Sequence, residues 1–511
     1  MADAQCWIDA LEAACKTLTV GQLVSTQART YGSVTAIDIF DRNERATYSE
    51  MDRWSNKYAH ALCSFGVRKG DRIGVMLPNH IQFPLLWFAL AKLGAVLVPV
   101  NMRYTHREIE YVLSDTQAKF AIVDESAWPV FSAMDPWPRN LAKGQTIVVG
   151  TSAKFAATTL DDLLKGIQDS PVDKDVRPDD LLNVAYTCGT TGFPKGCMLT
   201  HDYWGVGSYG SSATQYQPCT RFLSWSPFFY GETQGQLLRS YRQGGTLYLA
   251  PQMSSSQFIG WLKRYHIEWC AFLEFVTRQP AADDASTCVK LIRCCSGWSR
   301  GSIERFRGRF GARGQNMYGT MEIGWCTIVP ADFDHVDQCG SIGMRAPFRA
   351  LRLVSDDGTP TPVGEVGELW ASGRGMFKGY WNRPEANAES FSGEWFKTGD
   401  MMRRDEFGFY WLVGRTKDVI RRSGENIAAR EVEAVIREIA EIEDVAAVPV
   451  RDAKRGEEVK VYVQLKEGRS PKDSPAERIL EHARARLAVF KVPRYVAFIE
   501  ALPRRRPATK F

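Results

Sequence analysis

Apolar runs alternate with helical patterns in the first part of the chain. Residues 95–100 and 120–123 form short apolar runs typical of buried strands, and the largely apolar stretch 71–77 also predicts a strand. Apolar positions at helical spacing over residues 82–92 and 106–113 predict helices between these strands. Strands that are apolar on both faces and separated by helices are typical of a parallel sheet covered on both sides. We therefore predict an α/β fold for this region.

The pattern changes after residue 340. Short strand-like segments joined by turns, at 352–355, 367–371, 394–398 and 410–413, predict a β-rich subdomain. A new pattern, with helices and strands of its own, begins after the segment Gly414-Arg-Thr-Lys-Asp. The β-rich subdomain therefore ends the first large unit of the chain.

These changes predict two domains. The first, residues 1–415, is a large N-terminal domain that contains the parallel sheets and the β-rich subdomain. The second, residues 416–511, is a small, mobile α+β domain, and the hinge lies near Lys417. A chain of 511 residues is too long for one ordinary core, which agrees with this division.

The composition excludes several classes of protein. With 44% hydrophobic and 24% charged residues, the chain is typical of globular proteins and not of disordered ones. The net charge of +5 is too small for a nucleic-acid-binding surface. All of this excess lies within residues 416–511. A basic C-terminal lobe suits a polyanion such as CoA or ATP, although a solvated surface is the more common reason for such charge.

The cysteines and the apolar segments predict a cytoplasmic protein. The 12 cysteines form no C-x-x-C pair, which is typical of reduced thiols. The first 18 residues carry charges and contain no apolar signal region. The most apolar stretch, residues 83–100, is interrupted by Lys92 and Gly94, so we expect a buried helix and strand there and no membrane span.

The segment Tyr186-Thr-Cys-Gly-Thr-Thr-Gly-Phe-Pro-Lys-Gly is the most informative part of the sequence. Its glycines allow backbone N–H groups to turn toward an anion, while its threonines add hydroxyl donors and Lys195 adds a positive charge. A strand-like run, 181–187, leads into it. The spacing differs from that of the P-loop NTPases. We therefore predict a phosphate-binding loop of another kind.

This segment resembles the phosphate loop of the adenylate-forming enzymes, which include acyl-CoA synthetases, peptide-synthetase adenylation domains and luciferases. It matches the family's Tyr-Thr-Ser-Gly-Thr-Thr-Gly-x-Pro-Lys-Gly except at Cys188. The resemblance extends over nearly the whole chain. It implies an acid–thiol ligase that activates a carboxylic acid with ATP and Mg²⁺ to an acyl-adenylate and then transfers the acyl group to CoA.

The segment Asn316-Met-Tyr-Gly-Thr-Met-Glu resembles the family's next motif. By this resemblance Tyr318 stacks on adenine, Asn316 binds the adenine amino group, and Glu322 is the metal ligand, holding Mg²⁺. A carboxylate beside a triphosphate suits this cation. Met321 replaces a threonine of the motif, and Thr320 is the candidate to supply the missing hydroxyl.

Two later segments, Trp395-Phe-Lys-Thr-Gly-Asp and Gly414-Arg-Thr-Lys-Asp-Val-Ile, also match the family. They imply that Asp400 and Arg415 bind the ribose and that Lys417 is the hinge. The resemblance implies these ATP- or AMP-binding residues in all: Thr187, Cys188, Gly189, Thr190, Thr191, Gly192, Lys195, Asn316, Tyr318, Gly319, Thr320, Glu322, Asp400 and Arg415.

The C-terminal lobe contributes two further expectations from the resemblance. Gly424 lets the CoA chain approach closely, and Lys510 offsets the charge of the carboxylate and the α-phosphate during adenylation. At the C-terminus Thr509 stands where the family's motif has a glycine, and the segment leading to Lys510 is one residue longer than in that motif. The implied catalytic residues are Thr187, Lys195, Glu322 and Lys510.

By the same resemblance the acyl pocket is expected near Tyr230, Gly297, Trp298 and Trp325. The aromatic side chains of Tyr230, Trp298 and Trp325 suit a cyclic, aromatic or medium-length acid, or equally belong to the core. The expected partners are the acid, ATP and CoA, without nucleic acid or membrane. The oligomeric state stays open, with a homodimer as one alternative.

Three other functions compete with this interpretation. An enzyme that stops at the acyl-adenylate and passes it on is the main alternative, and a nucleotide-binding relative without catalysis is another. The segment Gly297-Trp-Ser-Arg-Gly also matches the nucleophile elbow of serine hydrolases, with Ser299 as nucleophile. The only downstream histidines are His335 and His482, and no oxyanion segment is evident, so the hydrolase is the weakest alternative.

Overall fold

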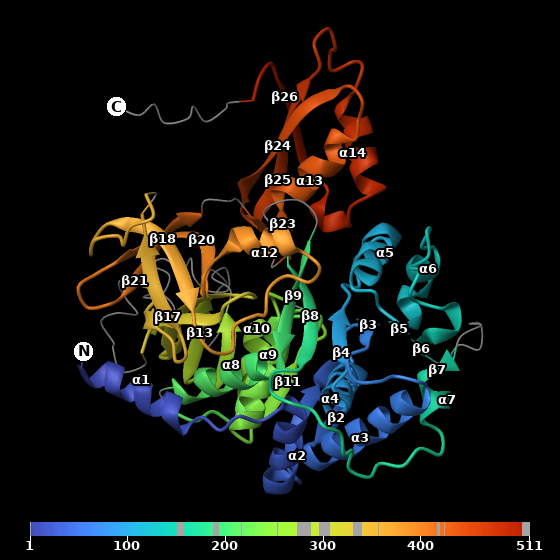
Figure 1. The fold of residues 1–511 in the computed structure, drawn as a ribbon, viewed down its shortest axis with the longest axis vertical. Coiled ribbons are helices and arrows are strands. Elements are labelled where there is room, and N and C mark those ends of the chain that lie inside the picture. Colours follow the sequence, from blue (N-terminus) through green and yellow to red (C-terminus); the bar gives the residue numbers. More distant parts are fainter. Residues whose placement is uncertain are drawn as a thin grey trace.

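The structure is a computed structural model of the 511-residue chain. It describes residues 2–150, 158–187, 194–215, 217–252, 254–272, 288–295, 307–330, 340–355, 357–415, 419–423 and 425–502. Figure 1 shows a large body made of two sheets and a β-rich subdomain, with a small C-terminal lobe above it. The predicted α/β class is confirmed. The residues around the predicted hinge, 416–418, lie outside the described ranges, so the domain boundary stays a prediction.

The first sheet carries the predicted phosphate loop. Its strands are β3 (Arg72–Met76), β4 (Val96–Pro99), β5 (Phe120–Asp124), β6 (Thr146–Val149), β7 (Thr158–Thr159), β8 (Leu181–Thr187) and β9 (Lys195–Thr200). They are arranged in the order β7-β6-β5-β3-β4-β8-β9. All pairs are parallel except β8 with β9, which form an antiparallel hairpin at the edge of the sheet.

The second sheet of the large body is mixed. Its strands are β1 (Thr35–Ile39), β2 (Glu44–Thr47), β10 (Arg221–Ser224), β11 (Thr246–Leu249), β12 (Trp269–Phe272), β13 (Leu291–Cys295), β14 (Arg313–Thr320), β15 (Gly324–Ile328) and β16 (Met344–Arg345). The order is β16-β15-β14-β13-β12-β10-β11-β1-β2. Neighbouring strands from β14 to β1 along this order pair in parallel. The pairs β14–β15 and β15–β16 are antiparallel.

Helices cover both faces of each sheet. The helices of the large body are α1 (Ala2–Ala14), α2 (Val20–Tyr31), α3 (Tyr48–Ser64), α4 (Gln82–Leu93), α5 (His106–Asp115), α6 (Trp128–Ser132), α7 (Leu160–Leu164), α8 (His201–Ala213), α9 (Gly231–Arg242), α10 (Phe258–Arg264) and α12 (Pro384–Ser390), with 3₁₀ turns η1 (Phe40–Arg42), η2 (Glu125–Ala127) and η3 (Lys143–Gln145). The core that contains Ile73 and Leu247 lies between the two sheets and includes α2, α3, α4, α8 and α9. Helices α5 and α6 pack on the outer face of the first sheet, and α10 packs on that of the second.

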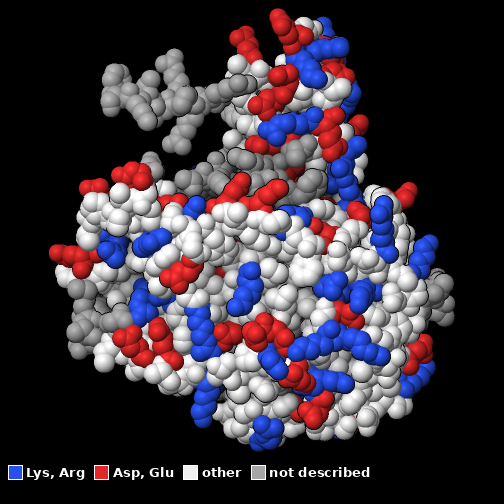
Figure 2. All heavy atoms as spheres, in the orientation of Figure 1, with Lys and Arg blue, Asp and Glu red and all other residues white. Residues whose placement is uncertain are grey.

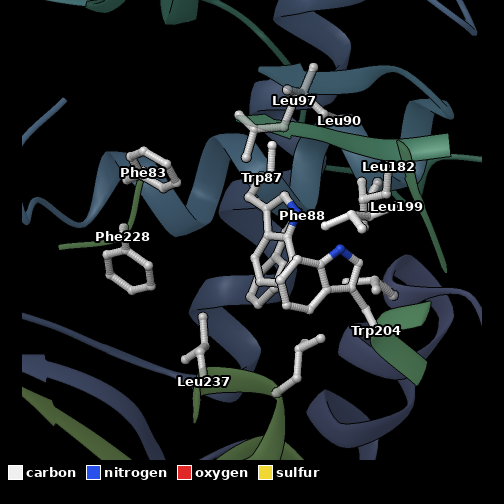
Figure 3. Close-up of a cluster of buried hydrophobic side chains, with 14 of the residues drawn as sticks. Phe83, Trp87, Phe88, Leu90, Leu97, Leu182, Leu199, Trp204, Phe228 and Leu237 are labelled. Carbon is white, nitrogen blue, oxygen red and sulfur yellow. The ribbon is translucent and has the colours of Figure 1, made fainter. Parts of the chain in front are cut away.

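Helix α4 is almost completely buried in the central core. Trp87 and Phe88 pack there with Trp204 of α8, as Figure 3 shows. Both indole N–H groups, of Trp87 and Trp204, donate to Asn183 Oδ1 of β8, at 3.1 and 2.9 Å. These bonds anchor the strand that leads to the phosphate loop. The buried ammonium group of Lys92 donates hydrogen bonds to Asp52, Ser55 and Asn56. No described helix is both long and apolar enough to cross a membrane.

The β-rich subdomain and the C-terminal lobe follow in the chain. The subdomain has β17 (Ala350–Val354), β18 (Val366–Ser372), β19 (Phe391–Ser392), β20 (Trp395–Arg404) and β21 (Tyr410–Arg415). The lobe has β22 (Val419–Arg422), β23 (Glu425–Ala428), α13 (Ala429–Arg437), β24 (Ile442–Asp452), β25 (Gly456–Leu465), α14 (Ala476–Arg484), η6 (Val489–Lys491) and β26 (Tyr495–Ile499). On the face in Figure 2 the lobe carries acidic and basic side chains intermixed, so its positive excess forms no single patch there.

Candidate active site

The described ends of the phosphate loop are held in place by hydrogen bonds. Thr187 and Lys195 are cross-strand partners at the open end of the β8–β9 hairpin. Tyr111 of α5 donates its hydroxyl to the carbonyl oxygen of Pro194 at 2.9 Å, and the hydroxyl of Tyr186 donates to Asp115 Oδ2 at 2.6 Å. The predicted binding residues Cys188, Gly189, Thr190, Thr191 and Gly192 lie outside the described residues.

Lys195 and Glu322, both predicted catalytic residues, meet at a third side chain. The ammonium nitrogen of Lys195 lies 4.6 Å from the centre of the Tyr380 ring, and the Tyr380 hydroxyl donates to Glu322 Oε1 at 2.8 Å. Lys195 belongs to the first sheet, whereas Glu322 lies in the turn between β14 and β15 of the second. Tyr380 therefore links the two sheets at the predicted polyphosphate site.

Sequence reasoning did not single out Tyr380. Its segment, Phe377-Lys-Gly-Tyr, has no periodic pattern, and its position depends on a strand that lies far away in the chain. The backbone N–H of Lys378 donates to the Met198 carbonyl at 2.8 Å, which places the segment beside β9. The only available signal was the phenol itself, in a turn rich in aromatic and glycine residues.

Strand β14 carries the predicted adenine-binding residues. Asn316 is buried, and its side-chain amide donates to the Ser341 carbonyl at 2.8 Å. Tyr318 is also buried, and its hydroxyl donates to Asp400 Oδ2 of β20. The structure thus joins Tyr318, predicted to stack on adenine, directly to Asp400, predicted to bind the ribose. In the antiparallel pairing of β20 with β21, Asp400 lies opposite Arg415.

Met321 and Thr320 differ in their surroundings. The Met321 sulfur lies 3.8 Å from the Tyr203 hydroxyl, and its methyl group packs against Gly231 at the start of α9. Thr320 Oγ1 is buried and has no hydrogen-bond partner among the described residues. Since this hydroxyl is available, Thr320 can supply the donor that Met321 lacks.

Next to this site lies Cys197 of β9, a buried thiol. Burial raises its pKa well above the ordinary value; Glu322 raises it further, and Lys195 lowers it. Thr187 Oγ1 lies 4.0 Å from the Cys197 sulfur. The thiol is therefore a neutral neighbour of the site and no nucleophile.

Tyr230, predicted for the acyl pocket, contacts the C-terminal lobe. Its hydroxyl donates to Glu425 Oε2 of β23, and Asn101 Nδ2 donates to the Tyr230 hydroxyl at 3.3 Å. Arg103 forms an ion pair with the same glutamate at 3.3 Å. Burial raises the pKa of Glu425, while Arg103 and Lys491 lower it. The β22–β23 hairpin of the lobe is therefore docked against the predicted acyl end of the site.

Of the other predicted acyl residues, Trp325 lies in the described part of the chain. Trp325 packs against Met317, Ile328 and Ala346, and the guanidinium of Arg239 lies 5.3 Å from its ring centre. Gly297 and Trp298 lie outside the described residues, as do Ser299, Lys417, Gly424 and Lys510. The pairing of β14 with β15 has a β-bulge between Tyr318 and Gly319. Because Gly319 has no side chain, the two strands approach closely there.

A second contact between the lobes surrounds a cavity. Lys491 Nζ lies 2.8 Å from both Glu108 Oε1 of α5 and Glu431 Oε1 of α13. Arg107 pairs with Glu438 at 3.1 Å. The cavity of about 130 Å³ is lined by both lobes: Tyr104, Arg107, Glu108, Glu110, Tyr111, Val112, Pro194, Glu431, Val435, Arg486, Leu487 and Lys491. It has as many acidic as basic side chains, and no sequence motif predicted it.

Comparisons with known proteins agree with this arrangement. The sequence profile described as AMP-binding enzyme matches residues 24–381, and the profile of the AMP-binding enzyme C-terminal domain matches residues 431–508. The long-chain-fatty-acid–CoA ligase FadD13 of Mycobacterium tuberculosis is 30% identical over 472 residues, 90% of each chain. The crotonobetaine/carnitine–CoA ligase of Salmonella arizonae is 28% identical over 477 residues, again 90% of each chain.

A solved structure shows the same fold. The o-succinylbenzoate CoA synthetase MenE from Bacillus subtilis superposes with a TM-score of 0.81 at 23% identity, covering 94% of this chain and 95% of that one. Both family profiles match in chain order, and the curated relatives match over nearly their whole length. The chain therefore belongs to the AMP-binding enzyme family, in its acyl-CoA ligase branch.

Proposed function

We propose that this protein activates a carboxylic acid with ATP and Mg²⁺ to an acyl-adenylate and then transfers the acyl group to CoA. One observation carries the proposal: Lys195 and Glu322 converge on Tyr380 at the open end of the β8–β9 hairpin. A cation and a carboxylate that contact the same tyrosine at a glycine-rich loop suit a metal-bound polyphosphate.

The first half-reaction joins two anions, because the carboxylate oxygen attacks the α-phosphorus of ATP and pyrophosphate leaves. The protein must supply positive charge and alignment. In this proposal Lys195, Thr187 and the loop hold the phosphates, and Lys510 offsets the charge of the carboxylate and the α-phosphate. Glu322 would hold Mg²⁺, which offsets phosphate charge when bound. The carboxylate of Glu322, which accepts a hydrogen bond from Tyr380 at one oxygen, fits such a cation.

The nucleoside would lie along β14 and β20. Asp400 is fully buried and already accepts a hydrogen bond from Tyr318, so its carboxylate is fixed in place. A carboxylate can accept hydrogen bonds from two ribose hydroxyls. This arrangement supports Asp400 as the ribose acceptor, with Asn316 and Tyr318 at the adenine and Arg415 at the sugar.

The docked C-terminal lobe supports the second half-reaction. The thiolate of CoA attacks the acyl carbonyl, and AMP leaves. The hairpin that carries Glu425 lies against Tyr230 of the large domain, and the predicted CoA residue Gly424 directly precedes Glu425 in the sequence. We propose that the lobe occupies this orientation for thioester formation and rotates about Lys417 to bring Lys510 to the site for adenylation.

We propose a cyclic, aromatic or medium-length acid as the substrate. Tyr230 and Asn101 border the site at the acyl end, and a bulky aromatic side chain there shortens the space available to a chain. The reaction draws on ATP and CoA, which suits a cytoplasmic protein.

A screen of many acids tests the function directly. Pyrophosphate release is measured with ATP and Mg²⁺, with and without CoA, and acyl-CoA is measured in parallel. We expect acid-dependent pyrophosphate release and acyl-CoA formation only when CoA is present. Pyrophosphate without acyl-CoA would favour an enzyme that passes its acyl-adenylate on, and no release with any acid would refute the proposal. Palmitate outperforming every ring acid would refute the substrate class alone.

A further inference from the structure

The backbone of residues 377–381 is hydrogen-bonded to strand β9 and to the turn that carries Glu322. The N–H groups of Lys378 and Trp381 donate to the carbonyls of Met198 and Gly196 on β9, at 2.8 and 2.7 Å. The N–H of Phe377 donates to the carbonyl of Glu322 at 2.9 Å. This segment therefore fixes the distance between the phosphate-loop hairpin and the turn that carries Glu322.

The Tyr380 backbone is anchored by a further residue. Asn387 of α12 accepts from the Tyr380 N–H at 2.7 Å and donates to its carbonyl at 3.0 Å. Gly379 has φ +103°, and a Cβ at that position would press on the Asn387 side chain at 3.0 Å. A glycine is needed there because L residues rarely adopt this conformation.

The Tyr380 ring is buried and held by its neighbours. It makes an edge contact with Phe377 at 5.0 Å between ring centres, and Phe377 in turn stacks on Phe391 at 5.5 Å. The Lys195 ammonium nitrogen lies over the ring, 4.6 Å from its centre. A cation at this distance from an aromatic face is attracted by the ring quadrupole.

The phenol acts as a hydrogen-bond donor. It donates to Glu322 Oε1, and no described residue donates to the other carboxylate oxygen. One oxygen is thus fixed by protein while the other stays available to a cation.

From this geometry we infer that Tyr380 is a positioning residue of the nucleotide site. Its hydroxyl orients Glu322 toward Mg²⁺, and its ring holds the Lys195 ammonium beside the polyphosphate. The inference rests on the proposed function, since it assumes that ATP binds at this loop. A tyrosine that served only the packing of the core would need its ring and not its hydroxyl, so the two roles can be separated.

The test measures binding of a non-hydrolysable ATP analogue by calorimetry, with Mg²⁺ and with EDTA. Tyr380→Phe removes the hydroxyl and keeps the ring. We expect it to reduce the gain in affinity that Mg²⁺ provides by about tenfold, with little change in EDTA. Tyr380→Leu also removes the ring, and we expect it to weaken binding in EDTA severalfold as well.

Tyr48→Phe is the matched control. Tyr48 is fully buried, and its hydroxyl donates to the Gly245 carbonyl at 2.7 Å, away from the nucleotide residues. Its loss should lower thermal stability and leave the Mg²⁺ effect at the wild-type value. An equal Mg²⁺ effect in Tyr380→Phe and the wild type would overturn the inference. A wild-type protein that binds no analogue in either buffer would refute the proposed function instead.

A double-mutant cycle tests whether Tyr380 acts through Glu322. Glu322→Gln should abolish most of the Mg²⁺ effect by itself. If Tyr380 acts through Glu322, adding Tyr380→Phe to Glu322→Gln should cause no further loss of the Mg²⁺ effect. Additive losses in the two variants would contradict the inference.

Discussion

Lys491 of the C-terminal lobe forms an ion pair with Glu108 of helix α5, 2.8 Å from nitrogen to oxygen, although 383 residues separate them. The same glutamate is the third residue of helix α5. Its Oε2 accepts from the backbone N–H and the hydroxyl of Thr105, both at 2.9 Å, which completes a capping box. One carboxylate therefore fixes the start of α5 with one oxygen and the docked lobe with the other.

Replacing Lys491 should destabilise the protein strongly. Its side chain is only 2% exposed and lies between Glu108 and Glu431, so Lys491→Met leaves two carboxylates without their cation. Removing one member of a buried ion pair costs about 3–5 kcal/mol. We expect a loss of this size in the free energy of unfolding of the C-terminal lobe, measured by denaturant titration with fluorescence.

Arg107→Ala is the control for Lys491→Met. Arg107 also joins the lobes, through Glu438, but its side chain is 43% exposed. Exposed ion pairs contribute about 0–1 kcal/mol, so this variant should unfold almost as the wild type does. Equal stability of the two variants would contradict the importance of the buried pair.

Much of the large body was predictable from hydrophobic periodicity. Residues 82–92 predicted helix α4, and 71–77 and 120–123 predicted β3 and β5, because these elements are mostly buried and their sequences are largely apolar. The β22–β23 hairpin was missed. Its strands are only four residues long, and they are held by docking against Tyr230 as well as by their own pattern.

The candidate site was accessible to sequence reasoning only where a motif carries it. Glu322, Lys195 and Asp400 belong to segments with recognisable residue types. Tyr380 and Glu425 do not stand out, since their roles arise from contacts with residues that are 58 and 195 positions away. Local sequence contains no signal for such long-range contacts, so only the folded chain identifies them.

Protonation of His201 should make stability depend on pH. This histidine is fully buried, its Nδ1 accepts from the Val20 N–H at 3.1 Å, and burial lowers its pKa to about 4. Below pH 6.5 the unfolded chain binds a proton that the folded chain does not, so stability falls with falling pH. This group alone should cost roughly 2 kcal/mol between pH 7.5 and pH 5.

The His201 prediction is tested by comparing unfolding free energies at these two pH values. His201→Asn keeps an acceptor for Val20 but has no titratable ring, so the variant should lose about 2 kcal/mol less than the wild type over this range. Exposed His106 provides the control, and His106→Asn should keep the wild-type pH dependence. An unchanged slope in His201→Asn would refute the prediction.

Gly319→Ala should disturb the nucleotide site through the backbone. A Cβ at Gly319 would overlap the carbonyl of Gly324 on β15, because the two strands approach closely at the bulge. Relieving the overlap should cost about 1–3 kcal/mol of stability and move the turn that carries Glu322. Thermal unfolding and binding of the ATP analogue measure the two effects.

Gly260→Ala separates the Gly319 effect from the general effect of replacing glycine. Gly260 is exposed on helix α10, and a Cβ there meets nothing within 4 Å. Alanine at an exposed helical position is about 1 kcal/mol more favourable than glycine, so this variant should be at least as stable as the wild type. Normal analogue binding by Gly319→Ala would show that the bulge does not position the site.

Asp400→Asn should weaken nucleotide binding through the ribose. The amide keeps one oxygen to accept from Tyr318 but has neither the charge nor the second acceptor of the carboxylate. Hydrogen bonds to a charged group contribute about 1.5–3 kcal/mol, so we expect a loss of affinity for the ATP analogue of about 10- to 100-fold. Asp357→Asn, in an exposed turn where the carboxylate accepts from Thr359, should bind as the wild type does.

A nucleotide without ribose hydroxyls shows whether this loss comes from the sugar. If Asp400 accepts from those hydroxyls, 2′,3′-dideoxy-ATP should bind the wild type about as weakly as ATP binds Asp400→Asn. Removing the hydroxyls should then change the affinity of Asp400→Asn very little, because both changes remove the same interactions. Equal and independent losses from the two changes would place the ribose elsewhere and leave Asp400 as a partner of Tyr318 alone.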